Sequence, residues 1–159
     1  MCISLVAALA ASLGACRGPK RPPTPNPDRD PLAMLGGPAR PAPKLEDLLA
    51  LHPLGDQSYR ADLLAIDADR SIFLVQSRRG IAPHFRRTHR ERTCVLAGSG
   101  TCWVEHRSYP AVAGSAFKIE PGATHRVTSS DDGSVLVALS VFEPPLAAID
   151  DDRTAVDAR

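Results

Sequence analysis

The sequence predicts an all-β domain, an antiparallel sandwich or barrel, and three observations lead to that fold class. From residue 59 onward, polar and apolar residues alternate with a period of two in eight short segments. Glycine, proline and aspartate cluster between these segments, as in tight turns. No helical pattern separates the segments, and many short strands at regular spacing are typical of antiparallel sandwiches and barrels.

The expected strands follow one another closely along the second half of the chain. They cover residues 59–67, 71–78, 82–87, 91–97, 101–107, 116–120, 125–129 and 134–142. Before them, residues 44–51 (KLEDLLAL) have the leucine spacing of a short amphipathic helix, which Pro53 ends. We expect this helix to brace the barrel or to cover it as a lid. A chain of 159 residues has room for one domain of ordinary size.

The overall composition excludes some classes of partner. The chain has 19 basic and 18 acidic residues, so net charge does not favour nucleic acid. Aromatic residues make up only 4% of the chain, which argues against an aromatic platform for bases or sugars.

The N-terminal residues indicate export and lipidation. Residues 3–13 (ISLVAALAASL) form an apolar run with the length of a signal-peptide core, too short to span a bilayer comfortably. The run ends in Leu13-Gly14-Ala15-Cys16, which resembles the bacterial lipoprotein signal. That resemblance implies a signal peptide at 1–15, a lipid on Cys16 and a membrane anchor on the periplasmic or outer side of the bacterial cell envelope. No Lys or Arg precedes the run, and a start codon placed too far downstream would account for this. The alternative is a buried hydrophobic helix.

A proline-rich linker follows at residues 16–43. It contains nine of the 15 prolines of the chain. Such a segment favours extended conformations and acts as a semi-stiff spacer, as a lipid-anchored domain requires. A ligand for an SH3-type domain is the alternative use of this composition. We therefore expect a β-barrel domain at 44–146 to carry any function, and a polar tail at 147–159, frayed or loosely helical, to follow it.

Two segments carry the residues suited to a functional site. They read His84-x-Arg86-x4-Glu91-x6-Gly98 and Gly114-x5-Glu120-Pro121-Gly122-x2-His125-x3-Ser129. Both resemble the conserved motifs of the cupin superfamily, G-x5-H-x-H-x(3,4)-E-x6-G and G-x5-P-x-G-x2-H-x3-N. The resemblance covers residues 59–142 and implies a single-domain cupin with a double-stranded β-helix, or jelly-roll, barrel. It also implies that His84, Glu91 and His125 hold a divalent metal ion.

Strand geometry independently supports a shared site. Residues two apart on a strand share a face, so His84 and Arg86 point the same way, as do His89 and Glu91. If that face is the barrel interior, these side chains meet His125 from a later strand. Neutral imidazoles with one carboxylate suit a borderline divalent ion such as Mn, Fe, Zn or Ni.

The sequence departs from the cupin motif at its second histidine, where Arg86 stands. A guanidinium stays protonated and cannot ligate a metal. Two roles for Arg86 are open: it pairs with Glu91 and fills the site without an ion, or it binds a carboxylate or phosphate of the substrate. Gly80 is also too close to His84 for the leading glycine of the motif, and Ser129 replaces the terminal asparagine.

His89 offers a replacement for the missing histidine. The set His84, His89, Glu91 and His125 would restore three imidazoles and one carboxylate through a different spacing. Alternatively, His89 is an exposed residue of the hairpin connection, between Arg87 and Arg90, and has no role in the site.

Two cysteines flank Gly98-Ser99-Gly100, which is typical of a hairpin turn. Cys94 and Cys102 would lie on its two arms, where an oxidising compartment allows a cross-strand disulfide. The alternative is two small buried apolar side chains.

These observations favour an envelope lipoprotein whose cupin barrel binds a small polar or anionic ligand, around a divalent metal. A second hypothesis is a metal-dependent enzyme, an oxygenase, isomerase or lyase. A third is a metal-free binding or structural module. Pairing of cupins through their sheets also makes a homodimer compatible with the resemblance.

Overall fold

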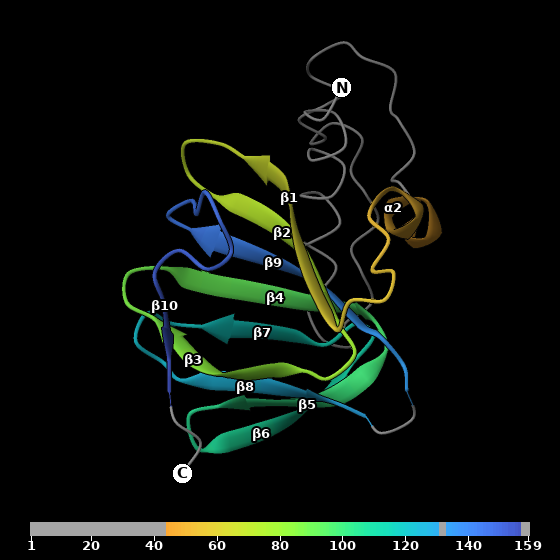
Figure 1. Ribbon diagram of the computed structural model, residues 1–159. Coiled ribbons are helices and arrows are strands. Elements are labelled where there is room, and N and C mark those ends of the chain that lie inside the picture. The colour runs from red at the N-terminus through yellow and green to blue at the C-terminus, as the bar shows by residue number, and fades with distance from the viewer. Residues whose placement is uncertain (1–43, 131–132, 157–159) are drawn as a thin grey trace, which may run out of the picture.

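The computed structural model describes residues 44–130 and 133–156, which fold into two antiparallel sheets and one short helix (Figure 1). The predicted all-β fold is confirmed. The predicted signal peptide, Cys16 and the linker up to residue 43 lie outside the described residues. The only helix among residues 44–130 and 133–156 spans seven residues, and none there is long and apolar enough to cross a membrane.

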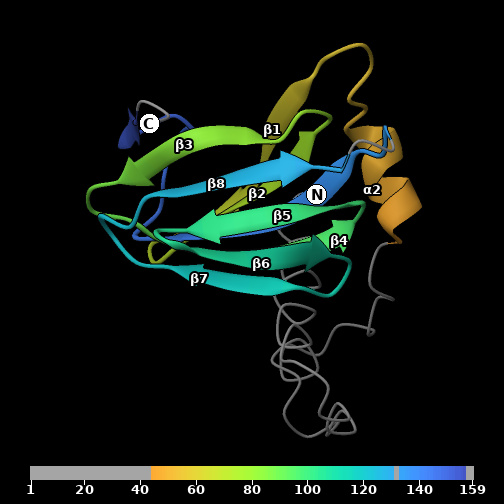
Figure 2. The same cartoon turned by 90° about the horizontal axis from the view of Figure 1, so that it is seen from below.

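Sheet A has the strand order β1-β2-β9-β4-β7. Its strands are β1 (Tyr59–Ile66), β2 (Ser71–Ser77), β9 (Leu136–Glu143), β4 (Arg90–Ala97) and β7 (Ala116–Ile119). Sheet B has the order β10-β3-β8-β5-β6. Its strands are β10 (Arg153–Ala155), β3 (Ile81–Arg86), β8 (His125–Ser129), β5 (Ser99–Val104) and β6 (Arg107–Val112). Figure 2 shows sheet B in front, with the dark-blue end of the chain beside β3.

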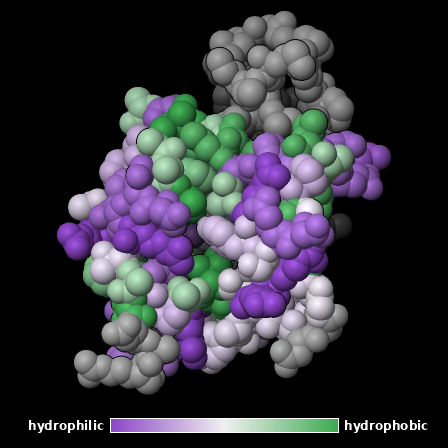
Figure 3. Space-filling model, in the orientation of Figure 1, coloured by the Kyte–Doolittle hydropathy of each residue, from purple (hydrophilic) through white to green (hydrophobic). Residues whose placement is uncertain are grey.

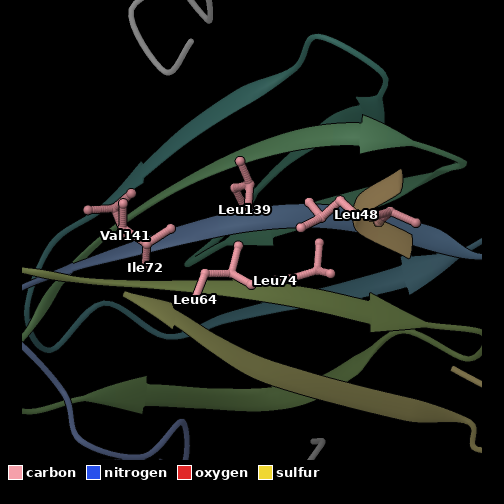
Figure 4. Close-up of a cluster of buried hydrophobic side chains, with 7 residues drawn as sticks. Leu48, Leu64, Ile72, Leu74, Leu139 and Val141 are labelled. Atoms are coloured by element: carbon pink, nitrogen blue, oxygen red, sulfur yellow. The ribbon is translucent and has the colours of Figure 1, made fainter. Parts of the chain in front are cut away.

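Sheet A is buried on both faces along β2 and β9. Every residue of β2 (SIFLVQS) is buried, which explains a nearly continuous apolar run in place of alternation. On the outer face, Leu48 of helix α2 (Leu45–Leu51) packs with a cluster of branched side chains (Figure 4). Gln76 on the same face donates a hydrogen bond from Nε2 to the carbonyl of His52, which fixes the end of α2.

The inner face of sheet A faces the inner face of sheet B across the barrel core. Phe73 and Phe142 meet there edge to face, with ring centroids 5.7 Å apart. Leu146 and Ile149, which follow β9, pack in the same cluster. The chain beyond the predicted domain end therefore contributes to the core.

The connection between β4 and β5 corrects the predicted hairpin. β4 pairs with β7 and β9, whereas β5 pairs with β6 and β8, so the two strands lie in different sheets. Gly98 makes the corner with a φ of +79°, and a Cβ there would collide with the Val135 carbonyl. Cys94 and Cys102 therefore do not face each other, and Cys102 is a buried free thiol whose pKa burial raises to about 11.

Two strands were not expected from the pattern. β6 lies at the edge of sheet B and buries only Ala111, so its sequence, which includes Pro110, lacks a clear alternation. β10 belongs to residues 147–155, here called the C-terminal strap. The strap is neither frayed nor helical, because Arg153, Thr154 and Ala155 pair with Arg86, Phe85 and His84 of β3.

The visible surface mixes polar and apolar residues (Figure 3). Hydrophobic side chains gather toward the top of this face. Two apolar residues of β1, Leu63 and Ile66, are 40% and 51% exposed. Some exposed apolar residues are ordinary on a protein surface.

Candidate metal centre

The barrel encloses a cavity between the two sheets. Its volume is about 50 Å³, which is room for roughly three to five water molecules. Most of its wall is apolar. Its polar lining residues are Tyr59, Ser77, His84, Arg86, Glu91, Thr93, His125, Ser140 and Arg153.

His84, Glu91 and His125 line this cavity and converge on one another. His84 on β3 lies directly opposite His125 on β8, and their rings stand 4.1 Å apart. Glu91 reaches them from β4 in sheet A, so the group spans both sheets. All three residues are buried, and one nitrogen or oxygen from each lies within 4.8 Å of the others. We call these residues the metal centre.

Backbone carbonyls fix the two imidazoles in the same way. His84 Nδ1 lies 2.9 Å from the Ala82 carbonyl, and His125 Nδ1 lies 3.2 Å from the Ala123 carbonyl. A carbonyl only accepts, so each Nδ1 carries the donated proton and each Nε2 is left as the ligand atom. Burial, followed by the neighbouring His125, lowers the pKa of His84 to about 4, which keeps His84 neutral near pH 7.

Glu91 is held as a carboxylate by three donors. Burial alone would raise its pKa, but the hydrogen bond from His125 and those from Thr93 and Ser140 outweigh burial and lower it. Thr93 Oγ1 and Ser140 Oγ each lie 2.8 Å from Oε1 of Glu91. Oε2 lies 3.3 Å from His125 Nε2 and remains as the ligand atom of Glu91.

This donor set fits a divalent transition metal. Ligands at about 2.0–2.2 Å from an ion stand roughly 3–4 Å apart, so the 3.3 Å between Glu91 Oε2 and His125 Nε2 agrees with a shared ion. A proton shared by these two atoms would occupy the same gap, and a metal would take its place. Two imidazoles and one carboxylate leave coordination positions for water or a substrate.

Arg86 lies in the cavity wall but turns toward the C-terminal strap. Its Nη1 and Nη2 donate to the carbonyls of Asp151 and Ile149, each at 2.6 Å. Its guanidinium carbon stands 4.5 Å from the centroid of the Phe142 ring. Glu91 is hydrogen-bonded to His125, Thr93 and Ser140, so these contacts do not reproduce the Arg86–Glu91 pair that the sequence left open.

His89 does not join the metal centre. It precedes β4, in the turn after β3, where strand alternation does not extend. Its Nδ1 lies 2.7 Å from Oδ2 of Asp152 in the strap, and Thr88 donates to the same oxygen. The hydrogen bond with His89 is the main cause of the lowered pKa of Asp152. The structure thus gives His89 a role in fastening the strap.

Five polar residues of the cavity were missed by sequence reasoning: Tyr59, Ser77, Thr93, Ser140 and Arg153. Thr93 could have been found, because it shares a strand face with Glu91. Ser140 sits opposite Thr93 on β9, a register that the sequence does not reveal. Tyr59 at the start of β1 and Arg153 on β10 had no signal at all, since neither belongs to a motif.

Solved structures with a similar fold include double-stranded β-helix proteins. No protein-family profile matches the chain, and no curated protein matches its sequence. Among solved structures, Streptomyces Pac13 with uridine aligns over 62% of this chain and 78% of its own, with a TM-score of 0.53 and 16% identity. KdgF from Halomonas sp. aligns over 57% and 83%, with a TM-score of 0.51 and 18% identity.

A protein with a double-stranded β-helix domain from Klebsiella pneumoniae aligns similarly, over 65% of this chain and 89% of its own. Its TM-score is 0.55 and its identity 16%. Identities this low establish the fold alone. The chain therefore has the double-stranded β-helix fold of the cupins, with a group of two histidines and one glutamate in its barrel.

Proposed function

We propose that this chain is a cupin-type binding protein that holds a divalent transition metal and a small polar or anionic ligand in its barrel. His84, Glu91 and His125 would supply the protein ligands, and Mn, Fe, Zn and Ni are the candidate ions. The observation that carries this proposal is the convergence of the three buried ligand atoms within 4.8 Å. The fixed Nδ1 atoms of both histidines and the two hydroxyl donors on Glu91 give further support.

Catalysis at this centre is a second proposal. Open coordination positions next to a cavity suit a metal-dependent oxygenase, isomerase or lyase. One solved structure with this fold is described as a nucleoside dehydratase, a statement about that protein only. A metal-free module is the competing proposal, and the 3.3 Å contact between Glu91 and His125, which needs no ion, favours it.

Metal titration of the full-length chain tests the proposal. After incubation with Mn, Fe, Zn or Ni and removal of excess ion, elemental analysis should find one ion per chain. Glu91→Gln keeps the shape of the side chain but removes its charge, so affinity should fall by more than the roughly 100-fold that loss of an outer-shell partner costs. Glu120→Gln, at an exposed carboxylate, is the matched control and should leave affinity unchanged.

Absence of any stoichiometric ion in the wild-type chain would reject the metal proposal and favour the metal-free module. If Glu91→Gln and Glu120→Gln bind metal with equal affinity, Glu91 is not a ligand and the ion binds at another place in the chain.

We also propose that the domain is tethered by a lipid on Cys16 to the bacterial cell envelope, and the support for this is the sequence pattern alone. Labelling with radioactive palmitate in a bacterial host should mark the chain. Cys16→Ser should abolish the label, and labelling that survives this change would contradict the anchor.

A further inference from the structure

Three polar side chains of the cavity lining are not part of the metal centre. They are Tyr59, Arg86 and Arg153. Arg86 is only 4% exposed, and its Nε has no hydrogen-bond partner among residues 44–130 and 133–156. Buried donors are nearly always satisfied in native proteins, so this Nε points to a missing acceptor.

Arg153 adds a second guanidinium to the cavity lining. It is carried by β10, and its Nη1 lies 3.1 Å from Oδ1 of Asp150. The Asp150 side chain is 74% exposed, so this pair is weak and Arg153 remains available to a stronger acceptor. The other two strap carboxylates have donors of their own: Asp152 accepts from Thr88 and His89, and Asp151 accepts from the Ala148 amide.

Charge in the cavity favours an anion. Among the described lining residues, two guanidiniums face one carboxylate, Glu91, which already accepts from its own donors. Tyr59 contributes a hydroxyl near Arg153, whose charge opposes the rise that burial causes in the tyrosine pKa. A divalent ion at the metal centre would add positive charge.

We propose that Tyr59, Arg86 and Arg153 form a subsite for a small carboxylate. The carboxylate would accept from the Nε of Arg86, from Arg153 and from the Tyr59 hydroxyl, and the rest of the ligand would extend toward the metal centre. The inference deepens the proposed function, because it names the ligand class for the same cavity. These three residues, however, need no metal to bind an anion.

The lining of the cavity favours a carboxylate over a phosphate. Ile81, Phe142 and Ile149 give the walls an apolar character, which suits the short carbon chain of a small carboxylate. The carboxylate group itself accepts charge-assisted hydrogen bonds from guanidiniums. The small volume limits the ligand to a few heavy atoms.

Arg86 has a further effect on this subsite. By binding the carbonyls of Ile149 and Asp151 it fixes the strap, and the strap carries Arg153 into the cavity. Arg86 is therefore a positioning residue for Arg153, besides offering its own Nε.

The test is a titration of the metal-stripped full-length chain, freed of chelator, with malonate, followed by nuclear magnetic resonance. Malonate should bind, and its neutral diamide should not. Arg153→Gln should weaken malonate binding about 10-fold or more, because it removes a charge-assisted hydrogen bond. Arg92→Gln is the matched control on the outer face, with a side chain that is 56% exposed, and should bind as the wild type does. Tyr59→Phe should weaken binding by a smaller factor.

Three results would overturn the inference: equal malonate affinity in Arg153→Gln and Arg92→Gln, no malonate binding with or without metal, or tighter binding of inorganic phosphate than of malonate. Metal titration of Arg153→Gln distinguishes failure of the carboxylate subsite from failure of the proposed metal centre. That variant should bind metal as the wild type does, and a chain that binds malonate but no metal would reject only the metal centre.

Discussion

Two groups of polar residues line the same cavity but are built from different parts of the chain. At the metal centre, His84, Glu91 and His125 stand on paired strands of the two sheets. In the other group, Arg86 is bonded to carbonyls that lie 63 and 65 residues further along the chain. The metal centre follows from strand spacing, while the contacts of Arg86 depend on how a distant segment packs. Mutations in the two groups should therefore separate metal binding from closure of the barrel.

Arg86→Met should give the largest loss of stability. The change removes two charge-assisted hydrogen bonds and leaves two strap carbonyls without their donor, so the free energy of unfolding should fall by about 3 kcal/mol. Urea unfolding measures this loss, and hydrogen exchange of the strap amides should accelerate with it. Metal affinity should change only a few-fold, because Arg86 is not a ligand.

Arg92→Met, at an exposed pair with Glu143, is the control for Arg86→Met and should cost much less. If the two variants unfold with similar free energies, the strap does not depend on Arg86.

Acid should lower the free energy of unfolding of the metal-free protein through His84 of the metal centre. His84 has a pKa of about 4 when folded and about 6.5 when unfolded, so between these values the unfolded chain binds the proton and the folded chain does not. Its contribution is fully present above pH 6.5 and is lost as the pH falls to 4, by up to about 3 kcal/mol. Urea unfolding between pH 7 and pH 4 measures this slope.

His84→Gln should flatten the pH dependence in that window, whereas His106→Gln, at an exposed position, should not. A slope that survives His84→Gln unchanged would assign the effect to other groups.

His89→Ala should have the smallest effect on stability, because His89 contacts the strap and lies outside the metal centre. It removes the contact with Asp152, whose side chains are 12% and 15% exposed, so stability should fall by about 1 kcal/mol. Metal affinity, measured as for Glu91→Gln, should stay within about two-fold of the wild type, since His89 lies outside the metal centre. A ten-fold loss of metal affinity would instead restore His89 as a ligand.

The metal centre and the contacts of Arg86 also differ in how far the sequence predicts them. The β-class, most strands and the convergence of His84, Glu91 and His125 were predictable, because period-two alternation and motif spacing act within single strands. The partners of Arg86 were not, because they are backbone carbonyls, which every residue carries. Gly98-Ser99-Gly100 misled for a physical reason: the same glycines that suit a tight hairpin also suit the corner between two sheets.

The position of Glu91 in sheet A, opposite two histidines of sheet B, has a mechanical consequence. An ion bound to all three side chains would be a cross-link between the two layers of the sandwich. Separating the layers would then require breaking coordination bonds as well as exposing Phe73 and Phe142 to water. Saturation of the site with metal should therefore suppress opening of the layers, and the loaded protein should unfold more nearly as one cooperative unit than the empty one.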